Sequence, residues 1–264
     1  MNGYSLTNES VKDITLKGIM KVESDFRANW DKVHVSRTYF PSVDKPVFIE
    51  LYNITNNSNK DLAIEVPSFK SVIETDSKDG VKGEIYSIMT SLDKSGTFHL
   101  KEGQSVQLTA INTAYIKGTC QIQVNSNEEL IRRVKCVDYW MNHLVFESPD
   151  TMINTMFAFS KIRACESIYE TKSGPMHGPG GEAYYATIWA NDQAEYINPY
   201  FPFTGYDYGN SSAFNAYKLF SKYMNKEWNP IPSSIIAEGL DIWCGAGDRG
   251  GAAMIAYGAS RYGK

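Results

Sequence analysis

The spacing of apolar residues changes once along this chain, near Asn125, and that change most constrains the fold. Before it, short runs alternate between apolar and polar residues, as in stretches 45–54 and 62–66. Alternation with a period of two is typical of half-buried strands. After Asn125, apolar residues recur every three or four positions, which is typical of helices. The sequence therefore predicts a β domain followed by a helical domain.

Polar turn clusters separate the apolar runs of the first half. Stretch 55–61 is rich in asparagine, and Lys101–Gln104 joins two runs in the same way. Further strands are expected at 83–88, 96–100, 105–110 and 119–124. Many short strands with polar turns favour an antiparallel β-sandwich, which we place at residues 1–125.

The second half begins with helical signals. Ser126 is a candidate N-cap, Glu128 and Glu129 are first-turn acids, and we expect a linker helix over 126–147. Its apolar stripe consists of Leu130, Val134, Val137, Met141 and Leu144. Ser148-Pro149-Asp150 then ends this helix. Later helices are expected at 151–170, 187–198, 211–225 and after Asp248, and long loops at 173–186 and 226–247.

Two glycine-rich loops of the helical half carry aromatic and acidic residues. The first runs through 178–196 and the second through 238–250. An indole face packs on the apolar face of a sugar ring, and a carboxylate accepts hydrogen bonds from its hydroxyls. In a barrel of helical hairpins, both loops would reach one end. We then expect one cleft to contain Glu182, Asp192, Glu238, Asp241 and Asp248.

Composition excludes several classes of function. The chain is 42% hydrophobic and 21% charged with a net charge of −4, and it has no basic stripe that would indicate a nucleic-acid partner. Its 13% aromatic content suits carbohydrate binding and equally suits a tyrosine-rich core. No window is apolar enough to span a membrane. The four cysteines fit no metal or redox spacing, so we expect mostly buried free thiols, with one disulfide as an alternative.

The motifs Gly180-Gly181-Glu182-Ala183-Tyr184 and Trp189-Ala190-Asn191-Asp192 resemble those of the six-hairpin, (α/α)6-barrel glycosidase superfamily. The resemblance implies a multidomain β + α chain: an antiparallel β-sandwich, a linker helix, and a partial (α/α)6 barrel over 148–264. It implies that Asp192 holds hydroxyls of the sugar in the −1 subsite. Asn191 departs from the pattern, which usually has arginine there. Because such a barrel needs twelve helices, the resemblance also implies a truncated fragment of a longer enzyme.

By the same resemblance, the parent protein is a glycoside hydrolase, most often inverting, that uses paired carboxyl groups. No spacing of His, Asp and Glu residues indicates a metal site, and no cofactor is expected. We assign the acid to Glu238, because the nearby Trp243 would partly desolvate it and raise its pKa. Asp241 is the second catalytic candidate. The alternatives are an ion pair or hydroxyl contact for Glu238 and a turn aspartate for Asp241. This fragment is expected to be inactive alone, with the second catalytic carboxylate beyond Lys264.

Six further residues are candidates for binding substrate: Trp189, Asp192, Glu182, Trp243, Asp248 and Arg249. Four of them have a structural alternative. Trp189 could belong to the core, and Asp192 could be a buried structural carboxylate. Asp248 could be a helix cap, and Arg249 could form a salt bridge. Glu195 and His177 are weaker candidates, with a helix surface and a structural loop as their alternatives.

Two rival functions stay open at this point. One is a glycoside phosphorylase on the same scaffold, and the other is a non-catalytic carbohydrate-binding protein. In either case the expected partner is an oligo- or polysaccharide, and neither the sugar nor the oligomeric state follows from the sequence. The N-terminus lacks the features of a signal peptide. We therefore expect a cytoplasmic protein, or a periplasmic or extracellular one if a signal peptide lies upstream.

Overall fold

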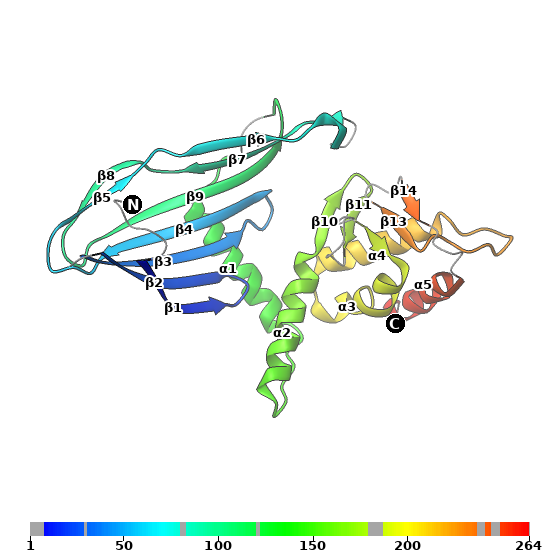
Figure 1. Cartoon of the computed structure of the whole chain (residues 1–264). Coiled ribbons are helices and arrows are strands. Elements are labelled where there is room, and N and C mark those ends of the chain that lie inside the picture. Colours follow the sequence, from blue (N-terminus) through cyan, green and yellow to red (C-terminus); the bar gives the residue numbers. More distant parts are fainter. Residues whose placement is uncertain are drawn as a thin grey trace. The chain divides into compact units, whose positions relative to one another are not determined.

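The computed structural model describes residues 8–28, 31–79, 83–119, 122–178, 187–236, 241–243 and 249–263. The chain forms two compact units, residues 1–137 and 138–264 (Figure 1). The sequence-based division at 125 and 147 stays a prediction; the boundary between the two compact units, after Val137, falls within α1 (Ser126–Asn142).

The first unit is built on a seven-stranded antiparallel sheet with strand order β1-β2-β3-β4-β9-β7-β6 (Figure 1). Its strands are β1 (Glu9–Leu16), β2 (Met20–Ala28), β3 (Asp31–Pro41), β4 (Val47–Asn56), β6 (Lys70–Glu74), β7 (Tyr86–Leu92) and β9 (Ser105–Ile116). A second sheet pairs β5 (Leu62–Val66) with β8 (Gly96–Leu100). A short 3-10 turn, Ser77–Asp79, follows β6.

The two faces of the large sheet are covered at different ends. In β4, Val47, Ile49 and Leu51 are buried, and then the buried position shifts to Ile54. Because side chains alternate between faces along a strand, Leu51 and Ile54 lie on opposite faces. The sequence pattern predicted alternation but not this change of buried face.

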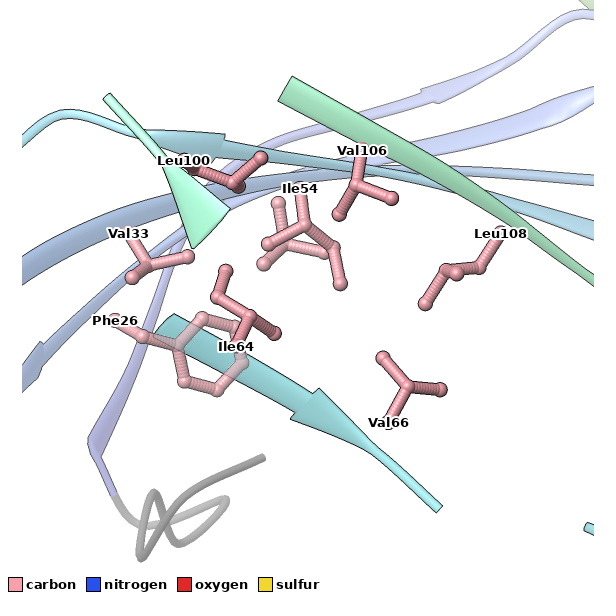
Figure 2. Close-up of a cluster of buried hydrophobic side chains, with 9 residues drawn as sticks. Phe26, Val33, Ile54, Ile64, Val66, Leu100, Val106 and Leu108 are labelled. Atoms are coloured by element: carbon pink, nitrogen blue, oxygen red, sulfur yellow. The ribbon is translucent and has the colours of Figure 1, made fainter. Parts of the chain in front are cut away.

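One face packs against the β5–β8 sheet and forms the sandwich core. Figure 2 shows Ile64 and Val66 of β5 facing Ile54, Val106 and Leu108 of the large sheet. Phe26, Val33, Val35 and Leu100 complete this cluster. The predicted antiparallel sandwich is therefore present at this end of the sheet.

The opposite face packs against α1 and the segment before it. Phe40, Val47, Ile49 and Leu51 are buried there, and Ile19, Ile111, Ile122, Val124 and Leu130 pack on them. The expected strand at 119–124 is not seen in its described residues; Ile122 and Val124 instead contribute side chains to this core.

Helix α1 begins one residue from the expected cap and is anchored by buried charges. The Oδ1 atom of Asn125, and not the Ser126 hydroxyl, accepts from the backbone N–H groups of Asn127 and Glu128. Glu129 is buried and accepts from Lys45 Nζ at 2.6 Å and Ser42 Oγ at 2.7 Å. These contacts hold the first turns of α1 on the β3–β4 connection.

The second unit contains helices, hairpins and a small sheet. Helix α2 (Thr151–Glu166) starts at an Asp150 N-cap, whose Oδ1 accepts from the backbone N–H of Met152 at 2.9 Å. The hairpin β10 (Ile168–Thr171)–β11 (Gly174–His177) follows. The remaining elements are β12 (Ile188–Trp189), the π-helical segment η4 (Asp192–Ile197), α3 (Phe201–Thr204), α4 (Asp207–Ser221), β13 (Ser234–Ile236), β14 (Asp241–Trp243) and α5 (Arg249–Tyr262).

Several local expectations for this unit were wrong. The helix from Thr151 ends at Glu166, four residues early, because the chain turns into β10. The expected helix at 187–198 is a strand followed by η4, and the expected loop at 226–247 contains β13 and β14. The unit therefore contains some of the expected helices. It also contains a three-stranded sheet, which the spacing of apolar residues did not predict.

Candidate functional site

The candidate site is built on the three-stranded sheet β12-β13-β14 (Figure 1). Trp189 pairs with Ser234, and Ser234 pairs with Trp243, so three strands contribute to one cross-strand row. The neighbouring row is Ile188, Ile235 and Ile242. Antiparallel partners directly opposite each other lie on the same face of a sheet. Two tryptophan positions 54 residues apart in sequence thus lie in one row, with one strand between them.

The other face of this sheet belongs to the core of the second unit. Ile188 and Ile235 are fully buried and pack with Met176, Ala216, Leu219, Phe220 and Ile231. Alternation therefore turns Trp189 toward the opposite face, where its side chain is half-buried and its row neighbour Ser234 is buried. A core role and a stacking role for Trp189 both stay predictions.

Asp192 begins the π-helical segment directly after β12. The backbone N–H of Asn198 donates to Gln193 O at 2.9 Å, which closes the wide turn. Such turns are rare in proteins and often occur at functional sites. Burial raises the pKa of Asp192, and the Glu195 carboxylate adds to the rise, so Asp192 and Glu195 lie close enough to interact. Asp192 is thus a half-buried carboxyl near Trp189.

Gln193 connects η4 to the hairpin before it. Its side chain is fully buried, and Nε2 donates to the carbonyl of His177 at 2.7 Å. Burial lowers the pKa of His177 to about 4. Hydrogen bonds with the backbone of His177 and Ala164 raise the pKa, but by less than burial lowers it. The His177 ring is therefore neutral at physiological pH and packs edge-on against Phe201. We assign His177 a structural role.

Glycine lets α5 approach η4 closely. A Cβ atom built on Gly258 would lie 2.6 Å from Ala194 Cα, and Arg261 Nη1 donates to Glu195 O at 3.0 Å. These contacts fix the segment that carries Asp192 against the last helix.

The structure brings together only part of the predicted site. Trp189 and Asp192 lie close in sequence at the β12–η4 junction, and the register of β14 adds the backbone positions of Asp241 and Trp243. Arg249 is the first residue of α5. Glu182, Glu238 and Asp248 lie outside the described residues.

Sequence analysis missed Ser234 and Gln193. Ser234 is buried between the two tryptophan positions, and no hydrogen-bond partner of its Oγ is found among the described residues. The signal for β13 was the short apolar run Ile235-Ile236 inside what was interpreted as a loop.

Two further searches of the described residues give negative results. No group of three or more His, Cys, Asp or Glu side chains there could hold a metal ion. No helix in the described ranges is long and apolar enough to cross a membrane.

Comparison with known proteins shows the fold. No family model and no curated protein matches the chain. Among solved structures, one described as "Putative kojibiose phosphorylase from human microbiome" is similar over 97% of this chain, with a TM-score of 0.62 and 9% sequence identity. The present chain spans 43% of the length of that protein. At this identity the likeness concerns fold alone: an antiparallel β unit followed by a largely helical unit, as in part of that structure.

Proposed function

We propose that this chain is part of a carbohydrate-active enzyme that cleaves glycosidic bonds, with its saccharide site at β12–β14 and η4. The observation that carries the proposal is the cross-strand row containing the positions of Trp189 and Trp243, with the half-buried carboxyl of Asp192 following β12 in the chain. Aromatic faces and a carboxylate are the groups that recognise a sugar ring and its hydroxyls.

Each residue has a distinct role in this proposal. Trp189 and Trp243 supply stacking surfaces, and Asp192 accepts hydrogen bonds from sugar hydroxyls. Glu238 is the proposed general acid, with Asp241 as the alternative. Glu182, Asp248 and Arg249 are further proposed contacts to the substrate.

Hydrolysis and phosphorolysis differ only in the nucleophile that reaches the anomeric carbon. In hydrolysis a carboxylate activates water, whereas in phosphorolysis inorganic phosphate attacks the anomeric carbon, the remaining saccharide leaves as an alcohol, and a sugar 1-phosphate is formed. The name of the similar solved structure favours phosphorolysis as a second candidate beside the hydrolase. The products formed in the presence and absence of phosphate separate the two reactions.

The first test is saccharide binding by the intact chain. Isothermal titration with glucose disaccharides of different linkage should detect binding, and Trp189→Ala should weaken it at least about fivefold, since one aromatic contact contributes about 1–3 kcal/mol. Trp228→Ala is the matched control, because Trp228 is 89% exposed in the same unit. Equal affinities of Trp189→Ala and the unsubstituted protein would contradict the proposed site.

The second test separates chemistry from binding. In the longer parent enzyme, Glu238→Gln removes the proposed acid while keeping its shape, so cleavage should be lost and saccharide affinity kept. Reactions of that enzyme with and without phosphate, resolved by anion-exchange chromatography, identify the nucleophile. If the parent protein binds saccharide but cleaves none under either condition, the non-catalytic alternative is supported.

A further inference from the structure

One face of the large sheet is covered only in part by described segments. Val47 and Ile49 of β4 are buried on the face that packs toward α1, and the register places Met89 of β7 on that face too. The alternate positions on these strands point the other way, and there Phe48 is 41% exposed and Ile88 45% exposed. The β5–β8 sheet covers the other end of this second face, over Ile54, Val106 and Leu108, and Tyr52 packs at the edge of that cluster.

A continuous hydrogen-bonded network of polar side chains lies on this open face. Thr90 Oγ1 donates to Asn112 Oδ1 at 2.7 Å, and Asn112 Nδ2 donates to Glu50 Oε1 at 3.1 Å. Tyr52 OH donates to the other oxygen of Glu50 at 2.6 Å. The four side chains come from β4, β7 and β9, so three neighbouring strands hold them in fixed orientations.

The network leaves matched donors and acceptors available. A carboxylate has about four acceptor positions, of which Tyr52 and Asn112 occupy two on Glu50. The Asn112 amide retains a second N–H, because an amide nitrogen has two donors. A carboxylate acceptor next to an amide donor suits two adjacent hydroxyls of a sugar. Burial, together with the bond to Glu50, raises the pKa of Tyr52, so its hydroxyl stays a donor.

Aromatic side chains flank this network. Phe48 is the register partner of Asn112, and Tyr39 is the register partner of Glu50. Cross-strand partners have Cβ atoms about 5 Å apart, so each ring borders the network directly. An exposed ring beside ordered polar groups is the arrangement that binds the apolar face of a pyranose.

The charges on this face favour a neutral ligand. Arg37, which is near Tyr52, is bound by Glu9 and by Ser24 Oγ at 2.9 Å. Glu50 is the carboxylate at the centre of the network; its charge repels an anion, and its remaining acceptor positions can be filled by sugar hydroxyls. A neutral, hydroxyl-rich chain therefore complements this surface better than an anion.

We propose that the open sheet face formed by Tyr39, Phe48, Glu50, Tyr52, Thr90 and Asn112 is a second, non-catalytic binding site for a neutral polysaccharide chain. This goes beyond the proposed function, because the site lies in the other unit and needs no catalytic residue. It would hold a polymeric substrate independently of the site at Trp189.

Affinity electrophoresis of the intact chain in gels containing soluble starch, dextran, barley β-glucan or galactomannan tests this proposal. We expect retardation by at least one polymer, and at least fivefold weaker retardation for Asn112→Ala and Phe48→Ala. The matched controls are Asn53→Ala, on the opposite face of β4, and Phe203→Ala, an exposed ring of the second unit. Both controls should migrate as the unsubstituted protein does.

Two further variants make the outcome decisive. Thr90→Val keeps the side-chain shape and removes the hydroxyl that orients Asn112, so it should also weaken retardation if Asn112→Ala fails to fold. Trp189→Ala should keep polymer retardation even if it loses disaccharide binding, which distinguishes this site from the proposed function. Absence of retardation in all four polymers, unchanged retardation in folded Asn112→Ala and Thr90→Val, or its loss in Trp189→Ala would overturn the proposal.

Discussion

At the scale of single residues, Glu129 shows how a buried charge joins two elements. Burial alone would raise the pKa of Glu129, but hydrogen bonds from Lys45 and Ser42 outweigh it and hold the pKa below its usual range. A carboxyl whose pKa is lowered in the folded state stabilises the fold above its unfolded-state pKa. That contribution disappears as the pH falls through the folded-state pKa.

We expect Glu129→Gln to lower the free energy of unfolding at pH 7 by about 2–3 kcal/mol, because Lys45 loses its charged partner. The loss should shrink between about pH 5 and pH 3, where the carboxyl of the unsubstituted protein becomes protonated. Urea denaturation across this range measures both effects. Glu128→Gln, an exposed neighbour, is the control, and a pH-independent difference would contradict the role given to the Glu129 charge.

The pKa of Asp192 is shifted in the opposite direction from that of Glu129. Burial, then the Glu195 charge, raises the pKa of Asp192, so its ionised form destabilises the fold at neutral pH. We expect Asp192→Asn to raise the free energy of unfolding at pH 7 by about 0.5 kcal/mol, a modest gain because solvent screens a half-exposed group. The gain should vanish below about pH 4. Thermal unfolding at pH 7 and pH 3.5 gives the comparison; destabilisation at pH 7 would show that Asp192 is a structural carboxylate.

At the scale of elements, the η4–α5 contact depends on the absence of a side chain at Gly258. An added methyl group would lie 2.6 Å from both Cα and O of Ala194, and one of the two elements would have to move. We therefore expect Gly258→Ala to cost about 1–3 kcal/mol, despite the better helix propensity of alanine. Gly263→Ala is the control, because its nearest contact is an ordinary 3.5 Å from Ala259 O. Equal unfolding midpoints for the two variants would refute close packing here.

A second prediction at this scale concerns strand β4. Ile49 and Ile54 are both buried but lie on opposite faces of the sheet, in different clusters. Alanine at either position should cost about 2–5 kcal/mol, whereas Asn53→Ala, at an exposed position, should change stability by less than about 0.5 kcal/mol. Chemical denaturation of the three variants tests this. A neutral effect at Ile49 or Ile54 would mean that only one face of the strand is packed.

At the scale of the whole molecule, each compact unit has its own core. The clusters around Ile54 and Ile49 contain only residues of the first unit, and the cluster around Phe220 contains only residues of the second. We expect Phe220→Ala to reduce hydrogen-exchange protection chiefly in α4 and β13, and Ile54→Ala to do so chiefly in β3, β4 and β9. Exchange measured by mass spectrometry on the full chain provides the test, and equal loss of protection in both units would contradict it.

The sequence by itself determined that a β unit precedes a largely helical unit, because the spacing of apolar residues depends on which side of each strand or helix is buried. It also located the strands from Val47 to Val66 and the break at Ser148–Asp150, since these depend on nearby residues. Only the tertiary structure decided that β4 changes its buried face, that 188–189 is a strand, and that β13 lies between two tryptophan positions. Those features depend on partners far apart in the chain, which local periodicity does not encode.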